Sequence, residues 1–273
     1  MTGALFIVGA FACSPAPAPT VLPEVPVAPV AVPVPQWPAP GTPLRVLKVD
    51  DPATPLTVVV DAGHGAPGNS GNTSCTCTPE QDVTLDVASD LGNNLGTGIV
   101  VHQGRAGDAR PTYPDRKKLA ENIHADAIVS IHTDSRGEPD PDKPCPTTDD
   151  QPGFSVLWSD EGPDALVAGR HRLAQAIAIR MSEAGFLAYD GVEYTGLYAA
   201  EQVPGVFLDR HAPNKRIYML RRTTLPTVII ELMNAWHPAE TARWQEPATR
   251  AALAGAVRAA LVDVSAPPGG PER

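Results

Sequence analysis

Short, continuous runs of apolar residues recur along the chain from residue 56 onward. Many residues in these runs are β-branched, and such runs are typical of strands that are buried on both faces of a sheet. We therefore predict strands at Leu56–Val60, Gly98–Val101, Ala127–Ile131, Phe154–Trp158, Arg216–Leu220 and Thr227–Ile230.

Between these runs, apolar residues follow the three- and four-residue spacing of amphipathic helices. One helix is expected to begin with Thr78 as its N-cap, Pro79 at the first helical position and Gln81 completing a capping box. Further helices are predicted from Thr112 onward, over Pro163–Ala184 with Gly185 as the stop, and over Ala239–Val262. Strands that alternate with helices predict one α/β domain, with a twisted, mostly parallel sheet flanked by helices.

The first 45 residues lack this alternation. Residues 1–12 are mostly apolar and are followed directly by Cys13. This arrangement is typical of a lipoprotein signal peptide, in which Cys13 becomes the lipidated first residue. No basic residue precedes Cys13, so a cleaved secretory signal and a plain hydrophobic N-terminus are alternatives. Residues 1–12 are too few to span a bilayer, which takes about 20. We expect an exported protein of the periplasm or cell envelope, anchored to a membrane through this lipid.

Proline marks the next boundary. Eleven of the 31 prolines lie between Ser14 and Arg45. Proline fixes φ and removes a backbone donor, so residues 14–45 are predicted to form an extended linker rather than a helix or a central strand. The folded domain is then expected over residues 46–264, followed by a short tail over residues 265–273.

The charge balance excludes one class of partner. The chain has 21 Lys and Arg residues against 31 Asp and Glu residues, a formal net charge of −10. Proteins that bind nucleic acids need basic surface to neutralise phosphates. We therefore expect no nucleic-acid partner.

Three cysteines lie within the predicted domain. In an oxidising compartment we expect Cys145 to pair with Cys75 or with Cys77, tying two loops together. Cys75 and Cys77 are a poor pair for each other, because residues two apart rarely reach disulfide geometry. A metal site at the Cys-Thr-Cys segment is the weaker alternative.

Ionisable residues follow three of the predicted strands. His64 comes shortly after the first strand, His132 directly after the third and Glu231 directly after the last. Because ligands bind at the carboxyl ends of strands in open α/β sheets, these side chains should converge on one cleft. Glu80 lies in the first turn of the helix that follows the first strand, and it could join these side chains. Two imidazoles and a carboxylate suit Zn²⁺, and a further carboxylate could act as the base for a water molecule.

Each of these residues also has a structural interpretation when it is taken alone. Glu80 is a carboxylate of the kind that the macrodipole favours at a helix start. Glu231 could pair with Arg221 or Arg222. His211 and Asp134 are weaker candidates for contact with a substrate. The functional hypothesis depends on His64, Glu80, His132 and Glu231 all falling at one edge of one predicted sheet.

Four segments resemble, in order and spacing, the signature blocks of the N-acetylmuramoyl-L-alanine amidases of the type 3 zinc amidase family. They are VVVDAGHG, PEQDVTLDVA, IVSIHTDS and LPTVIIELMNAWHPAE, and the resemblance covers roughly residues 55–262. It implies a single α/β domain, one Zn²⁺ held by His64, Glu80 and His132, and a catalytic Glu231. It also implies peptidoglycan as the substrate, cut at the amide between N-acetylmuramic acid and L-alanine.

Two departures from the family pattern concern the loops around these residues. The segment after the catalytic glutamate is usually E-x-G-F-x-S-N, whereas here Glu231 is followed by Leu-Met-Asn-Ala-Trp-His. The loop between His64 and Glu80 carries Cys75 and Cys77. Two alternative functions are a different zinc amidohydrolase or peptidase acting on cell-wall stem peptides, and a non-catalytic peptidoglycan-binding lipoprotein.

Overall fold

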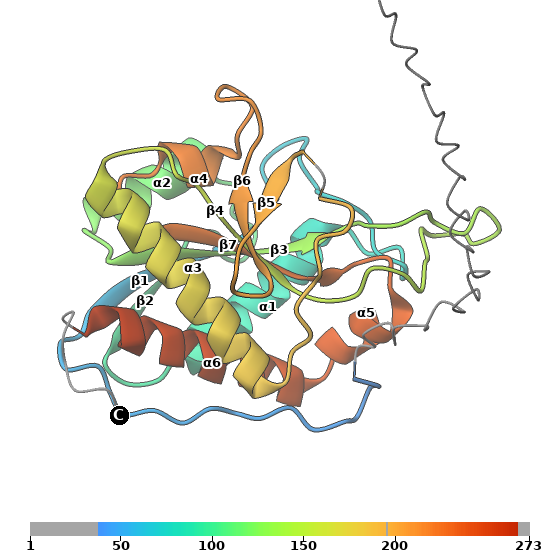
Figure 1. The fold of residues 1–273 in the computed structure, drawn as a ribbon, viewed down its shortest axis with the longest axis horizontal. Coiled ribbons are helices and arrows are strands. Elements are labelled where there is room, and N and C mark those ends of the chain that lie inside the picture. Colours follow the sequence, from blue (N-terminus) through green and yellow to red (C-terminus); the bar gives the residue numbers. More distant parts are fainter. Residues whose placement is uncertain (1–37, 195, 267–273) are drawn as a thin grey trace, which may run out of the picture. The chain divides into compact units, whose positions relative to one another are not determined.

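The structure is a computed structural model that describes residues 38–194 and 196–266 (Figure 1). The predicted signal peptide, Cys13 and most of the predicted linker and tail lie outside these residues. Residues at the end of the predicted linker contact the folded domain, because the Arg243 guanidinium donates to the carbonyls of Ala39 and Thr42. The backbone N–H of Arg45 also donates to the Ala184 carbonyl at 2.9 Å.

Seven strands form one mixed sheet in the order β2-β1-β3-β7-β4-β6-β5. The neighbours β1–β2, β1–β3, β3–β7 and β4–β6 are parallel, whereas β4–β7 and β5–β6 are antiparallel. The predicted α/β domain with a mostly parallel sheet is therefore confirmed. The strands are β1 Leu56–Ala62, β2 Ile99–Gln103, β3 Ala127–Asp134, β4 Ser155–Trp158, β5 Tyr198–Ala200, β6 Val206–Asp209 and β7 Thr227–Asn234.

Six helices flank the sheet in the described part of the chain. They are α1 Glu80–Asn94, α2 Tyr113–Asn122, α3 Asp164–Ala184, α4 Tyr218–Arg222, α5 Pro238–Trp244 and α6 Pro247–Ser265. Figure 1 shows α3 and α6 side by side, and their many contacts agree with this view. None of these helices combines the length and the apolar character needed to cross a membrane.

Alternate strand positions divide the core between the two faces of the sheet. Val58, Val60 and Ile131 pack with the buried residues of α1, α3 and α6 in the main core. Val59 and Ile128 face the other way, toward a smaller cluster with α2 and α4. Side chains alternate along a strand, so His132, next to Ile131, lies on the α2 and α4 face.

Three details of the predicted elements are wrong. Arg216–Leu220 is not a strand, because α4 begins at Tyr218. Met219 and Leu220 are both buried in clusters on one face of the sheet, which consecutive positions of a helix allow and those of a strand of this sheet do not. The last predicted helix is two helices, α5 and α6, because Pro247 cannot donate a backbone hydrogen bond and starts a new helix.

The start of α1 is the third correction. Pro79 is the N-cap, and no side chain caps the helix. The hydroxyl of Thr78 instead lies 3.1 Å from the Thr76 hydroxyl. By contrast, α2 begins directly after Thr112 and α3 ends at Gly185 with a left-handed φ of +97°, both as predicted. Thr112 also caps α2 in a capping box.

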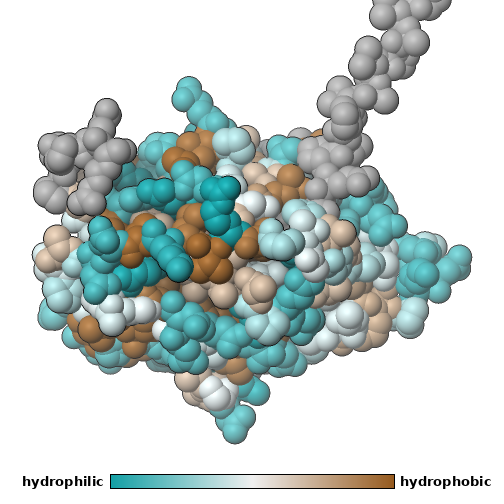
Figure 2. Space-filling model, turned by 90° about the horizontal axis from the view of Figure 1, so that it is seen from below, coloured by the Kyte–Doolittle hydropathy of each residue, from teal (hydrophilic) through white to brown (hydrophobic). Residues whose placement is uncertain are grey.

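Large hydrophobic side chains that remain exposed are spread over separate segments. Val46, Val100, Ile179, Val192 and Leu197 are each about half exposed. Figure 2 shows hydrophobic residues interspersed with hydrophilic ones on the face seen from below Figure 1. Single exposed residues of this kind are common on protein surfaces and do not define a binding site.

Candidate active site

Three of the predicted residues meet at one point. The ligand atoms of His64, Glu80 and His132 all lie within 4.8 Å of one another. One oxygen of Glu80 is 3.1 Å from His64 Nε2, and the other is 3.2 Å from His132 Nδ1. The two imidazoles meet edge to face with their centroids 4.8 Å apart. The carboxylate therefore lies between the two imidazoles.

Each of these side chains comes from a different element. His64 follows β1 with a positive φ of +60°, Glu80 is the first residue of α1, and His132 lies in β3. Two glycines make room for them. A Cβ atom at Gly63 would lie 2.5–2.7 Å from the His132 ring, and one at Gly71 would lie 2.4 Å from Glu80 Oε2. Both positions therefore require glycine, because any side chain would push into a ligand.

The His64 ring is oriented from outside the cluster. Its Nδ1 is 2.6 Å from Asn69 Oδ1, and the Asn69 amide donates to the Tyr113 hydroxyl at 3.2 Å. With a metal ion bound, a proton on Nδ1 would leave the Nε2 lone pair free to bind the metal. Partners of this kind fix the tautomer and ring orientation of metal-binding histidines.

Glu80 is held by an unusually complete set of donors for a buried carboxylate. The Asn72 backbone and side-chain N–H groups both donate to Oε2 at 3.0 Å, and the Thr133 N–H donates to Oε1 at 3.0 Å. Burial alone would raise the pKa of Glu80. The hydrogen bonds with His132 and His64 outweigh that effect and hold the pKa well below its ordinary value. The Glu80 carboxylate is therefore ionised at neutral pH.

Two buried arginines fix the loop that carries His64. Arg116 donates to Asp61 Oδ1 at 3.1 Å, to the Ala62 carbonyl at 2.7 Å and to the His64 carbonyl. Asp61 also accepts a hydrogen bond from Ser130 at 2.8 Å. Arg105 donates to the Gly63 carbonyl at 3.0 Å. Neither arginine was predicted from the sequence to belong to the site.

Glu231 lies beside the cluster on β7. It is the register partner of His132 on β3 and of Ser155 on β4, so the three side chains share one face of the sheet. Its Oε2 is buried and has no hydrogen-bond partner in the structure. Burial raises the pKa of Glu231 well above its ordinary value. The negative charges of Asp134 and Glu80 raise it further, and the positive charge of Arg136 opposes this.

The donor set fits a divalent transition metal. Two imidazole nitrogens and one carboxylate oxygen converge from three separate elements, and the outer nitrogen of His64 is already bonded to Asn69. A mixed set of this type suits Zn²⁺, which is commonly bound by three protein ligands in catalytic sites. Glu231 lies next to this group, and its unpaired oxygen leaves it open for proton transfer.

The sequence profile of the family described as N-acetylmuramoyl-L-alanine amidase matches residues 58–263, which include all of the described sheet except the first two residues of β1. The chain belongs to this family. The predicted family resemblance is confirmed, and with it the assignment to a family of enzymes.

Amidase relatives support this placement over different lengths. The chain is 30% identical to the probable N-acetylmuramoyl-L-alanine amidase AmiB of Haemophilus influenzae over 93 residues, which are 32% of this chain and 21% of that protein. It is 25% identical to the N-acetylmuramoyl-L-alanine amidase Rv3717 of Mycobacterium tuberculosis over 194 residues, 71% of this chain and 69% of that one. These matches support peptidoglycan amidase activity.

Solved amidase structures share the fold. Ami1 from Mycobacterium abscessus superposes with a TM-score of 0.61 at 21% identity, covering 77% of this chain and 99% of that one. The amidase from Clostridium difficile 630 gives a TM-score of 0.58 at 22% identity, covering 77% and 97%. Identity at this level shows a shared architecture.

The two weaker substrate-contact candidates of this amidase-family chain lie in different surroundings. Asp134 is close to Glu231, accepts a hydrogen bond from the Tyr194 hydroxyl, and has an oxygen 3.6 Å from Arg136 Nε. Tyr194 in turn lies 2.9 Å from the Ser155 hydroxyl. His211 instead pairs with Asp209 at 2.8 Å and is not part of the three-residue group. Sequence analysis missed Tyr194.

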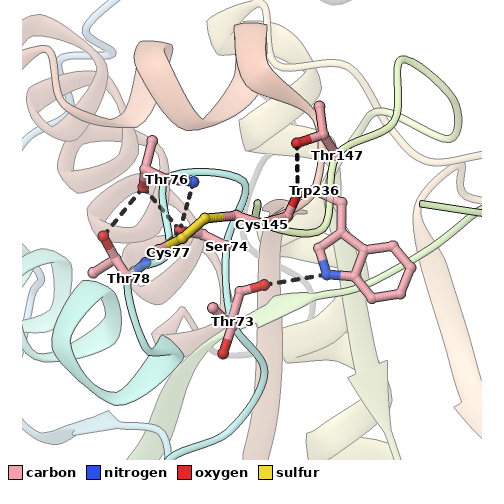
Figure 3. The surroundings of a disulfide bond; sticks show 8 residues. All are labelled: Thr73, Ser74, Thr76, Cys77, Thr78, Cys145, Thr147 and Trp236. Carbon is pink, nitrogen blue, oxygen red and sulfur yellow. Dashed lines mark hydrogen bonds between the residues drawn. A yellow bond between two sulfur atoms is a disulfide. The ribbon is translucent and has the colours of Figure 1, made fainter. Parts of the chain in front are cut away.

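A disulfide joins the loops on either side of the amidase cluster (Figure 3). Cys77 pairs with Cys145, 68 residues away, which resolves the alternative that the sequence left open. Cys77 lies just before α1, which begins with Glu80, and Cys145 lies in the loop that follows β3, which carries His132. Cys75 is free, and its thiol donates to the Thr241 hydroxyl at 3.3 Å. The cysteines are not part of the metal-binding group.

Proposed function

We propose that this chain is a zinc-dependent N-acetylmuramoyl-L-alanine amidase, which hydrolyses the amide between the lactyl group of N-acetylmuramic acid and L-alanine. One observation carries the proposal: His64, Glu80 and His132 converge on one point, with Glu231 in register beside them. Membership of the amidase family supports the substrate.

His64, Glu80 and His132 would hold the metal ion. When bound, Zn²⁺ supplies Lewis-acid chemistry, polarising a carbonyl and acidifying a water molecule. The ionised Glu80 supplies one negative charge to balance the cation. Asn69 keeps the His64 ring in the required orientation, and the donors from Asn72 and Thr133 keep the Glu80 carboxylate in place.

Glu231 is assigned to proton transfer at its unpaired Oε2. As a carboxylate it accepts a proton from the attacking water molecule, and as a carboxylic acid it donates that proton to the leaving amine of L-alanine. Burial and the charges of Asp134 and Glu80 favour the protonated form, and the charge of Arg136 favours the ionised form. Opposing influences of this kind suit a group that must alternate between the two states.

The decisive experiment is an analysis of reaction products. The full chain is incubated with purified peptidoglycan and Zn²⁺, and the soluble products are identified by mass spectrometry. We expect peptides with a free N-terminal L-alanine and glycan that retains its lactyl carboxylate. Products cut within the stem peptide would identify a peptidase instead. Binding to peptidoglycan without any products would identify a non-catalytic binding protein.

We also propose that the chain is exported and anchored through a lipid on Cys13. The apolar residues 1–12 before Cys13 support this, and so does the Cys77–Cys145 disulfide, because such bonds persist in oxidising compartments. In cell fractionation, wild-type protein should follow the membranes and Cys13→Ser should become soluble. A wild-type protein that is wholly soluble would reject the anchor.

A further inference from the structure

Trp236 presents an aromatic ring at the edge of the candidate active site. It lies five positions after Glu231, in the segment that departs from the family pattern. Trp236 is half-buried, whereas Trp158 and Trp244, the other tryptophans that the structure describes, are 6% and 0% exposed. Both of those rings belong to the main core. Trp236 therefore offers ring surface that the fold itself does not use.

One loop holds the indole ring of Trp236, and a second loop holds its backbone. The indole N–H donates to the Thr73 carbonyl at 3.2 Å, and the Trp236 carbonyl accepts from the Thr148 N–H at 3.0 Å. These loops are the two that the Cys77–Cys145 disulfide joins (Figure 3). A ring that is already immobilised loses little conformational entropy when a ligand binds to it.

The ring also lies close to the metal-binding group. Thr73, which holds the indole, directly follows Asn72, whose two N–H groups hold Glu80 Oε2 at 3.0 Å. The segment that holds the indole is therefore continuous with the segment that holds Glu80.

The charges around Trp236 favour one part of the substrate over the other. Asp149 and Asp150 are exposed on the loop that follows the Thr148 contact, and the charge of Asp149 acts on His237, next to Trp236. Acidic neighbours repel the carboxylates of a stem peptide. They do not repel the N-acetylated sugars, which are uncharged once the lactyl carboxyl is consumed in the amide, and they can accept hydrogen bonds from sugar hydroxyls.

We propose that Trp236 is a binding platform for an N-acetylated sugar ring of the glycan strand, next to the scissile amide. The indole face packs against the apolar C–H face of the sugar, in the manner of other amphipathic aromatic contacts. This proposal rests on the proposed amidase function for the identity of the polymer. It assigns to Trp236 a role in substrate binding and none in the chemical step.

The first test measures binding without hydrolysis. The probe is an oligomer of N-acetylglucosamine, which carries no carboxylate and contains no lactyl–peptide amide that an amidase of this class could cut. In a Trp37→Phe background of the full chain, the probe should produce a saturable change in tryptophan emission that disappears with Trp236→Ala. By calorimetry, Trp236→Ala should weaken binding about fivefold to tenfold. Val100→Ala, on the edge strand β2, serves as the control and should bind normally.

The second test separates binding from catalysis on intact peptidoglycan. Trp236→Ala should raise KM by about fivefold to tenfold with kcat nearly unchanged, and Trp236→Phe should recover part of the loss because it keeps an aromatic ring. An unchanged KM, or an emission change with free stem peptide but not with glycan, would overturn the proposal. If the wild-type chain cuts no peptidoglycan, the amidase proposal fails, and the emission and calorimetric measurements still decide whether Trp236 binds glycan.

Discussion

His132 and Glu231 are register partners on the neighbouring parallel strands β3 and β7. The register becomes irregular directly after this pair, between His132 and Asp134. The pairing places a metal-ligand candidate and a proton-transfer candidate side by side on one face of the sheet, on backbone that the sheet hydrogen bonds hold rigid. Mutating each residue in turn can therefore test whether His132 serves metal binding and Glu231 serves proton transfer.

Glu231→Gln should abolish most of the activity without affecting the metal. The amide keeps the size of the side chain but cannot take a proton from water, and general acid–base groups typically contribute about 10²–10⁴-fold in rate. We expect kcat to fall by at least the lower figure, with zinc content by elemental analysis equal to wild type. Loss of zinc would make Glu231 a ligand, and near-normal turnover would remove it from the mechanism.

His132→Ala should remove the metal. Only two of the three clustered side chains would remain. A metal ion that binds the folded state raises the melting temperature, so added Zn²⁺ should raise that of wild type and not that of the variant. His211→Ala is the matched control, because His211 pairs with Asp209 outside the cluster and should leave zinc content unchanged. A metal-free wild-type protein that hydrolyses peptidoglycan at the full rate would contradict the metal assignment.

Arg116→Met should destabilise the fold and loosen the His64 loop together. Arg116 and Asp61 are both fully buried, and removing one partner of a buried pair typically costs about 3–5 kcal/mol. Denaturant unfolding should show this loss, and zinc affinity should fall because the His64 carbonyl loses its donor. Arg180→Met, which breaks an exposed pair with Asp263, is the control and should cost much less.

Cys145→Ser should lower stability and Cys75→Ser should not. The Cys77–Cys145 bond closes a separation of 68 residues, and loss of a native disulfide typically costs about 2–5 kcal/mol. Thermal unfolding of the two variants, each compared with wild type under oxidising and reducing conditions, measures the difference. Equal melting temperatures for Cys145→Ser and oxidised wild type would show that the bond does not form in solution.

Glu240 should make stability depend on pH. It is fully buried, where burial raises its pKa from an ordinary 4.5 to about 7, against the opposing charge of Arg136 and the N–H groups of Asn234 and Gly153. The folded state therefore keeps a proton that the unfolded chain releases between about pH 4.5 and 7. Stability contributed by this group falls as pH rises through that window, by up to about 3 kcal/mol.

Glu240→Gln is the variant that checks this. Its free energy of unfolding should change less with pH than that of wild type between about pH 5 and 7, because the amide does not titrate. Parallel curves for the two proteins would show that Glu240 keeps an ordinary pKa in the folded state.

The sequence predicted the sheet and the position of the candidate ligands because both depend on local patterns. Buried strands appear as continuous apolar runs, and His132 and Glu231 each directly follow such a run. The short strands β5 and β6, of three and four residues, lack such a run. Whether Arg216–Leu220 forms a strand or a helix depends on which clusters Met219 and Leu220 reach, which is a tertiary property.

The residues that hold the candidate site in place were not predictable from the sequence, because their roles depend on tertiary contacts. Arg116 lies 52 residues from His64, whose carbonyl it holds, and nothing in its own helix distinguishes it from an exposed arginine. The cysteine pairing required the loop geometry, because Cys75 and Cys77 stand at almost equal sequence distances from Cys145. Tyr194 reaches Asp134 across 60 residues.

The glycines at 63 and 71 extend the functional site beyond its reactive groups. Neither carries a side chain, yet each is in contact with a candidate ligand, and Gly71 also has a φ of +77°. Saturation mutagenesis scored by cell-wall hydrolysis would therefore report both positions as intolerant as the histidines. A map of essential positions in this chain would include residues that matter for the space they leave free as well as residues with reactive side chains.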